Sequence, residues 1–179
     1  MSRNLTIPPD LPAPGPGRPE SVAVVAFGAN LGDREQTIRR AAERIARLPL
    51  VSDVRLSPLY ETVAVRIDGP DPDAPGYVNA VALVTTRLAP GVLLGMLHAI
   101  EEESGRERHE RWGDRTLDLD LIAYGDEVAD EPRLQLPHPR AAERLFVLEP
   151  WLGLDSEAEL PGRGRVADLV ADLRREDEA

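Results

Sequence analysis

The chain has 179 residues, 42% of them hydrophobic and 30% charged, which predicts a soluble globular protein with a single domain. Its formal net charge of −11 argues against a general nucleic-acid or membrane-surface binder, because such proteins need a basic footprint. The absence of cysteine excludes disulfides and thiolate chemistry, and with no apolar run of transmembrane length or signal-sequence pattern we expect a cytoplasmic protein.

The N-terminal stretch differs in composition from the rest of the chain. Six prolines within the first 20 residues predict a flexible tail outside the fold, followed by one domain over 21–179. The first apolar run, Val22–Phe27, is continuous and β-branched, which predicts a buried central strand. A glycine-containing turn over 28–32 then leads to a helix whose start carries a capping box of Asp33 and Gln36.

Hydrophobic periodicity predicts the remaining elements. Alternation after Gly76 predicts a strand with Tyr77 and Asn79 on one face and Val78 on the other. In chain order we expect a helix over 34–48, one long strand over 51–65 interrupted around Pro58, an acidic loop over 68–76, a strand over 77–86, a helix over 90–104, a strand from 117 to a turn at 124–126, two short extended segments around Pro132, a helical segment over 139–152 broken at Pro150, a loop over 157–164 and a last helix over 166–173.

The order of these elements predicts the fold class. Strand, helix, strand, strand, helix, strand is the ferredoxin-like α+β plan. The connections between successive strands are too short for parallel crossovers, so we expect a mainly antiparallel sheet with the helices on one face.

The strand after residue 116 carries two carboxylates. Residues two apart on a strand point to the same face, so Asp118 and Asp120 should lie side by side while Leu117, Leu119 and Leu121 face a core. Such a pair suits Mg²⁺, which takes one or two carboxylates together with substrate phosphates. Taken alone, the pair would more simply be two solvated aspartates on an exposed strand face. The upstream arginines favour phosphate binding instead, since guanidinium groups can fork onto phosphate oxygens.

All 21 residues counted as lysine or arginine are arginine, which excludes a Walker-A lysine and a Schiff base.

One segment of the chain resembles a signature of the 6-hydroxymethyl-7,8-dihydropterin pyrophosphokinases, a family of folate-pathway enzymes. This segment is Arg111-Trp112-Gly113-Asp114-Arg115-Thr116-Leu117-Asp118-Leu119-Asp120. The resemblance runs from about Val22 to Leu154 and includes the segments 28–34, 77–80, 100–106, 137–140 and 144–146. It implies the ferredoxin-like fold and the transfer of a diphosphoryl group from ATP to the hydroxymethyl group of the dihydropterin, with release of AMP.

The resemblance also implies roles at the phosphates. Asp118 and Asp120 are expected to bind two Mg²⁺ ions, and Arg106 and Arg115 to act with them as catalytic residues. We expect the segment over 106–115 to close over ATP, which is a co-substrate. Further contacts with ATP are expected from Glu101, Arg108, Trp112, Leu121, Arg133, His138 and Arg144.

For the pterin, the resemblance implies stacking between Tyr77 and Phe146 and a hydrogen bond with Asn79. Several of these residues have simpler interpretations when they are considered alone. Asn79 could make a hydrogen bond at a strand end, His138 between two prolines could be structural, and Glu101 could belong to a solvated helix face.

Other functions remain open from the sequence. A non-catalytic ferredoxin-like nucleotide-binding module would bind ligands without releasing AMP. A metal-dependent phosphohydrolase with the same Asp pair would release phosphate without an acceptor. A sheet-based RNA binder is disfavoured by the acidic charge and the shortage of sheet aromatics. We expect a monomer that acts on small molecules, with neither nucleic acid nor membrane as partner.

Overall fold

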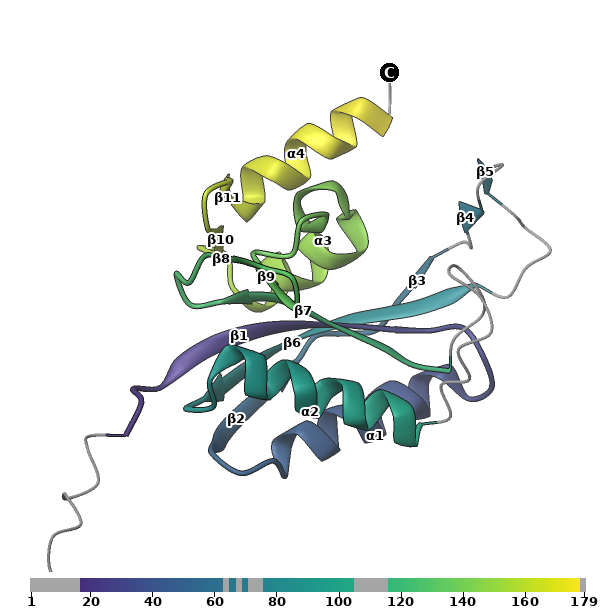
Figure 1. Ribbon diagram of the computed structural model, residues 1–179. Helices are drawn as coiled ribbons and strands as arrows, with labels where there is room; N and C mark the ends of the chain where they lie inside the picture. The colour runs from purple at the N-terminus through teal and green to yellow at the C-terminus, as the bar shows by residue number, and fades with distance from the viewer. Residues whose placement is uncertain (1–16, 63–64, 67–68, 71–75, 105–115, 178–179) are drawn as a thin grey trace, which may run out of the picture.

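A computed structural model of the chain describes residues 17–62, 65–66, 69–70, 76–104 and 116–177. A central antiparallel sheet lies between two layers of helices (Figure 1). In chain order the elements are β1 Ser21–Ala29, α1 Arg34–Ala46, β2 Val51–Leu56, β3 Tyr60–Thr62, β4 Val65–Arg66, β5 Gly69–Pro70, β6 Tyr77–Thr86, α2 Pro90–Glu103, β7 Asp118–Tyr124, β8 Ala129–Glu131, β9 Leu134–Leu136, a short 3₁₀ helix Ala141–Glu143, α3 Leu145–Leu154, β10 Glu159–Leu160, β11 Gly164–Arg165 and α4 Val166–Asp177.

The main sheet has the strand order β2-β6-β1-β7, and β3 also pairs with β6. All of its pairings are antiparallel. The first strand of the chain is therefore central, and the strand with the two aspartates is at one edge. This order, with α1 and α2 as crossovers, is the ferredoxin-like arrangement, so the predicted α+β fold is confirmed.

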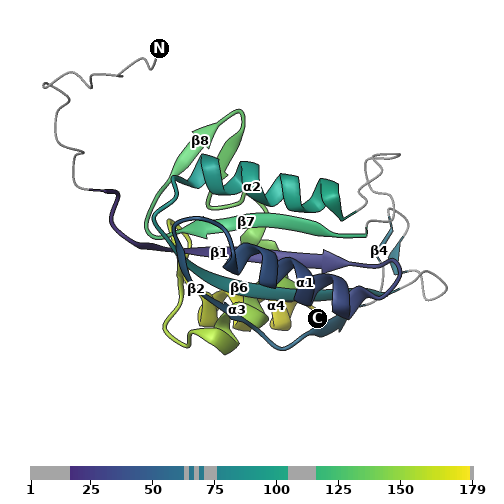
Figure 2. The ribbon, with the colours of Figure 1, turned by 90° about the horizontal axis from the view of Figure 1, so that it is seen from below.

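Helices cover both faces of the sheet. Figure 2 shows α1 and α2 in front of the sheet and α3 and α4 behind it. Along β1, Val25 and Phe27 are buried in the core beneath α1 and α2, whereas Val24 and Ala26 belong to the second core beneath α3 and α4. The prediction of helices on one face was wrong, because an apolar run without alternation requires cover on both sides.

Of two predicted breaks, the interruption around Pro58 is confirmed and the break at Pro150 is not. The long strand over 51–65 divides into β2 and β3, because Pro58 has no N–H and the Ser57 hydroxyl replaces a ladder partner by accepting from the Val81 N–H at 3.0 Å. The predicted break at Pro150 is absent, since α3 continues through it. A proline inside a helix removes one backbone hydrogen bond, and here the helix is held by buried Val147 and Trp151.

Short hairpins occupy two predicted loops, with β4–β5 beginning just before 68–76 and β10–β11 spanning the end of 157–164. The described part of the predicted tail contacts the domain. Arg18 forms an ion pair with Glu127 and lies 5.4 Å from the centre of the Tyr124 ring. Residues 1–16 lie outside the described residues. No helix in the described part of the chain has the length and apolarity that a membrane crossing requires.

The second helical layer predicts unequal effects of truncating two valines. Val147→Ala should lower the free energy of unfolding by about 1.5–3 kcal/mol, because it removes two buried methyl groups and leaves a cavity. Val128→Ala, at a side chain that is 73% exposed, should change it by less than about 0.5 kcal/mol. Urea denaturation measures both, and equal midpoints for the two variants would contradict the packing of α3 on the sheet.

Candidate active site

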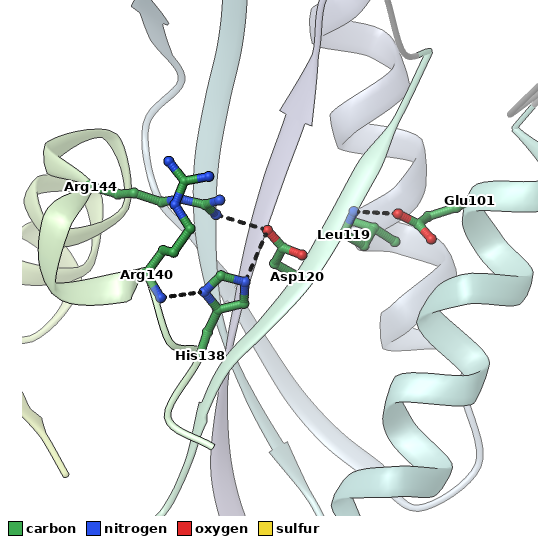
Figure 3. A network of polar contacts seen from close by, with 6 residues as sticks. All are labelled: Glu101, Leu119, Asp120, His138, Arg140 and Arg144. Carbon is green, nitrogen blue, oxygen red and sulfur yellow. Dashed lines mark hydrogen bonds and ion pairs between the residues drawn. The ribbon is translucent and has the colours of Figure 1, made fainter. Parts of the chain in front are cut away.

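Asp118 and Asp120 lie on the same face of β7, as predicted. Leu119 and Leu121 between and beyond them are buried in the core beneath α1 and α2, while both aspartates are partly exposed on the opposite face. β7 is the last strand of its sheet. The segment that follows β9 and the start of α3 both lie beside the face with the aspartates (Figure 3). The alternation of the sequence therefore presents two carboxylates where later parts of the chain can meet them.

Two side chains converge on one oxygen of Asp120 (Figure 3). Nη1 of Arg144 donates to Oδ2 of Asp120 at 3.0 Å, and Nε2 of His138 lies 4.0 Å from the same oxygen. The backbone N–H of His138 donates to the Ile122 carbonyl at 2.8 Å, which holds this segment against the outer edge of β7. Arg144 directly precedes α3. Two segments distant from Asp120 in sequence thus supply its polar partners.

The environment of His138 favours the neutral imidazole. The backbone N–H of Arg140 donates to Nδ1 at 3.2 Å, so this hydrogen bond assigns the proton of the neutral ring to Nε2, which faces Asp120. Burial lowers the pKa of His138 below its usual value of 6.5, against the opposing effect of the Asp120 carboxylate. The guanidinium groups of Arg144 and Arg140 lower this pKa as well, and Asp118 raises it.

Glu101 holds α2 to the strand of the aspartates. Its side chain is only 1% exposed, and Oε1 accepts a hydrogen bond from the Leu119 N–H at 2.8 Å. This N–H belongs to the residue between the two aspartates, on the opposite side of β7 from Arg144 (Figure 3). The interpretation of Glu101 as part of a solvated helix face was therefore wrong, whereas its neighbours Glu102 and Glu103 are exposed.

The predicted pterin residues lie on β6 and α3. Asn79 is 6% exposed, and its Nδ2 donates to Oγ1 of Thr62 at 2.7 Å. Tyr77 is partly exposed at the start of β6. Phe146 is 40% exposed, and the Arg144 guanidinium lies 5.7 Å from the centre of its ring. Arg144 therefore contacts both a predicted metal ligand and a predicted pterin residue.

Other predicted residues are not tested by these contacts. Arg106, Arg108, Trp112 and Arg115 lie outside the described residues, so their roles stay predictions. The side chain of Leu121 is buried in the core, which leaves its backbone for any contact with a ligand. Arg133 is exposed in the turn between β8 and β9. Among the residues near the site, Arg140 was not a predicted site residue, and both its backbone N–H and its guanidinium group act on His138.

The donor set of the site fits Mg²⁺. Asp118 and Asp120 offer carboxylate oxygens, the ligands that this hard cation prefers. Within the described residues, no group of three or more His, Cys, Asp or Glu could hold a metal ion. Two carboxylates without further protein ligands suit a cation that keeps several waters and takes the rest of its ligands from substrate phosphates.

The contacts of His138 predict how its pKa responds to charge. Asp120→Asn should lower the pKa of His138 further, because it removes the principal group that raises it. Since the pKa in the folded chain is already below 6.5, the unfolded chain binds more protons as the pH falls beneath that value, and stability falls there. Stability is lost between pH 6.5 and the lower pKa of the folded chain, so Asp120→Asn should extend this loss to lower pH.

An NMR titration of the imidazole in metal-free protein measures this shift. Asp53→Asn is the matched control, since Asp53 is exposed on β2 at the opposite edge of the sheet. An unchanged or raised pKa in Asp120→Asn would contradict the assigned contact.

Comparisons with known proteins place this geometry in a family. The family model for 7,8-dihydro-6-hydroxymethylpterin-pyrophosphokinase (HPPK) matches residues 24–156. A 2-amino-4-hydroxy-6-hydroxymethyldihydropteridine pyrophosphokinase of Pseudomonas aeruginosa is 43% identical over 147 residues, which cover 82% of this chain and 88% of the relative. A protein of the same name from Haemophilus influenzae is 39% identical over 148 residues, covering 83% of this chain and 90% of the relative.

Solved structures agree on the fold. A crystal structure of HPPK-DHPS in complex with substrates has a TM-score of 0.66 at 12% identity, covering 89% of this chain and 44% of that one. The Plasmodium falciparum HPPK-DHPS with pteroate has a TM-score of 0.67 at 14% identity, covering 92% and 44%. The chain thus spans less than half the length of these two solved chains, and at such identities the likeness shows the fold alone. The family model and the two bacterial relatives cover most of the sequence, and the chain belongs to the 7,8-dihydro-6-hydroxymethylpterin-pyrophosphokinase family.

Proposed function

We propose that the site around Asp118 and Asp120 carries out the reaction of this family. ATP donates its diphosphoryl group to the hydroxymethyl group of 6-hydroxymethyl-7,8-dihydropterin, which gives AMP and the pterin diphosphate in folate biosynthesis. The chain is therefore an ATP-dependent diphosphotransferase. The observation that carries the proposal is the pair of carboxylates side by side on β7, within the part of the chain that matches the family.

The reaction requires positioning and charge neutralisation more than covalent chemistry. The hydroxymethyl oxygen attacks the β-phosphorus in line, and a bond forms between them. The bond from the β-phosphorus to the oxygen that bridges to the α-phosphate breaks, and AMP leaves with the electron pair. The hydroxyl proton is released from the acceptor to solvent. The side chains of the site must therefore orient two substrates and neutralise the phosphate oxygens.

We assign the metal and phosphate end of the site to charged side chains. Asp118 and Asp120 would hold two Mg²⁺ ions, and bound Mg²⁺ would neutralise phosphate charge and lower the pKa of the acceptor hydroxyl. Arg144 aims the Asp120 carboxylate through their hydrogen bond and has further N–H groups for phosphate oxygens. The catalytic residues Arg106 and Arg115 would also contact the phosphates. The remaining contacts with ATP are assigned to Glu101, Arg108, Trp112, Leu121, Arg133 and His138.

We assign the pterin to the neighbouring end of the site. Tyr77 and Phe146 would stack on the two faces of the flat ring system, and Asn79 would hydrogen-bond to its edge. The partial exposure of both rings supports this assignment, because a ring already buried in the core could not receive a ligand. We further propose a cytoplasmic monomer whose catalytic domain comprises residues 21–179.

One assay tests the function and separates it from the alternatives. Incubation with Mg-ATP and 6-hydroxymethyl-7,8-dihydropterin should yield AMP and pterin diphosphate in equal amounts, and no AMP without the pterin. Phosphate released without an acceptor would indicate a phosphohydrolase. Nucleotide binding without turnover would indicate a non-catalytic module.

Asp118→Asn is the negative control for this assay. It should reduce kcat by about 10²-fold or more, because a lost metal ligand removes several kcal/mol of transition-state stabilisation. Asp126→Asn makes the same chemical change in the exposed turn after β7 and should leave kcat unchanged.

The pterin assignment predicts a selective effect at Phe146. Phe146→Ala should raise the Kd for the pterin by about 10-fold, because stacking on an aromatic side chain contributes about 1–3 kcal/mol. The Kd for Mg-ATP should change by less than about 3-fold. Isothermal titration measures both, and Phe146→Tyr should retain pterin binding. Equal weakening of the two ligands would refute the stacking role.

A further inference from the structure

Three strands bring Asn79, Gly28 and Asp118 into one row across the sheet. Gly28 of β1 pairs with Asn79 of β6 on one side and with Asp118 of β7 on the other. Residues paired across antiparallel strands point to the same face. Neighbouring strands are about 4.8 Å apart, so the backbones at the ends of this row are about 10 Å apart, with Gly28 midway.

The second core ends just before this row. The preceding row on the same face contains Val81 and Ala26, which are 0% and 8% exposed beneath α3 and α4. Gly28 follows two residues later on β1 and is partly exposed, although it lies in the interior of the sheet between two hydrogen-bonded strands. The helical layer therefore leaves the backbone at Gly28 accessible between the side chains of Asn79 and Asp118.

Neither the backbone nor the packing of the described residues requires a glycine here. Gly28 is not among the glycines with positive φ, so an L-residue fits its backbone. A Cβ at this position would meet Oδ1 of Asn79 at 3.6 Å and Cβ of Asp118 at 3.9 Å, which are ordinary van der Waals distances. A glycine inside a strand weakens it and often marks the close approach of a ligand. Among the described residues, a side chain here would fill the gap between Asn79 and Asp118 that the glycine leaves.

We propose that Gly28 is a specificity-determining residue and forms the floor over which the 6-hydroxymethyl group passes from the pterin site to the phosphates. This inference rests on the proposed function, since it uses Asn79 as the pterin contact and Asp118 as a metal ligand. The hydroxymethyl group must extend from the pterin, held by Asn79, toward the metal and phosphates at Asp118. The row runs directly between these two residues. The missing side chain at Gly28 then sets the size of the pterin 6-substituent that the site accepts.

Binding of two pterins to Gly28→Ala tests the inference. One is 6-hydroxymethyl-7,8-dihydropterin, and the other is 7,8-dihydropterin, which lacks the 6-substituent; both are titrated in the presence of Mg²⁺ and a non-hydrolysable ATP analogue. Gly28→Ala should weaken binding of the first by about 10-fold, since one methyl group in a fitted site discriminates by about 10–200-fold. Binding of the second should change by less than about 3-fold, and Gly28→Val should enlarge the difference.

Gly91→Ala in α2 is the matched control, because nothing lies within 4 Å of a Cβ built there, and it should leave both affinities unchanged. The thermal midpoint of Gly28→Ala should be no lower than that of the original chain. Should a variant fail to fold, the unaltered protein gives the same comparison: a pterin with a branched 6-(1-hydroxyethyl) group should bind about 10-fold more weakly than the hydroxymethyl compound.

Equal affinities of Gly28→Ala and the original chain for both pterins, or equal weakening of both, would overturn the inference. The AMP assay separates this failure from failure of the proposed function. If the original chain forms AMP but Gly28→Ala does not discriminate between the two pterins, the inference is wrong and the proposed function stands. Absence of AMP formation would remove both.

Discussion

The candidate site depends on how the edge strand β7 is held. Only one side of β7 pairs with a strand of the main sheet, so its outer N–H and C=O groups need other partners. The Glu101 carboxylate accepts from the Leu119 N–H, and the Ile122 carbonyl accepts from the His138 N–H. These two contacts attach α2 and the segment before α3 to the same edge. They fix the backbone on either side of Asp120, and its carboxylate is thereby placed before any ligand binds.

The two side chains beside Asp120, Arg144 and His138, differ in charge. Arg144 supplies a full positive charge at 3.0 Å, which offsets the cost of holding a carboxylate against the covered face of a sheet. His138 at 4.0 Å is kept neutral by burial and by the neighbouring arginines, so it adds a polar N–H without a second charge. Within the described residues, the ion pair with Arg144 brings one full positive charge to Asp120, which leaves room for a cation. Two would compete with a metal for the same oxygen.

Local patterns predicted much of the fold because alternation and helical periodicity are properties of neighbouring residues. The faces of β6, the pairing of Asp118 with Asp120 on one face, and the bounds of α1 and α2 within a few residues all follow from such patterns. The burial of Glu101 could not be predicted in this way, since its partner is a backbone N–H that the fold places beside α2. The second helical layer was missed although the continuous apolar run of β1 required cover on both faces, because helical periodicity identifies a helix but not the sheet face it covers.

The candidate site combines two parts that depend on different elements of the fold. Asn79, Gly28 and Asp118 come from three strands far apart in sequence, so their row forms only when the central sheet has formed. Arg144, His138 and Phe146 come from α3 and the segment before it, which lie as a layer on one face of the sheet. Local opening of that layer would separate Arg144 from Asp120 while the strand row kept its register. Strand pairing therefore sets the geometry of the row for the acceptor, whereas the packing of α3 on the sheet places the arginine that contacts both Asp120 and the Phe146 ring.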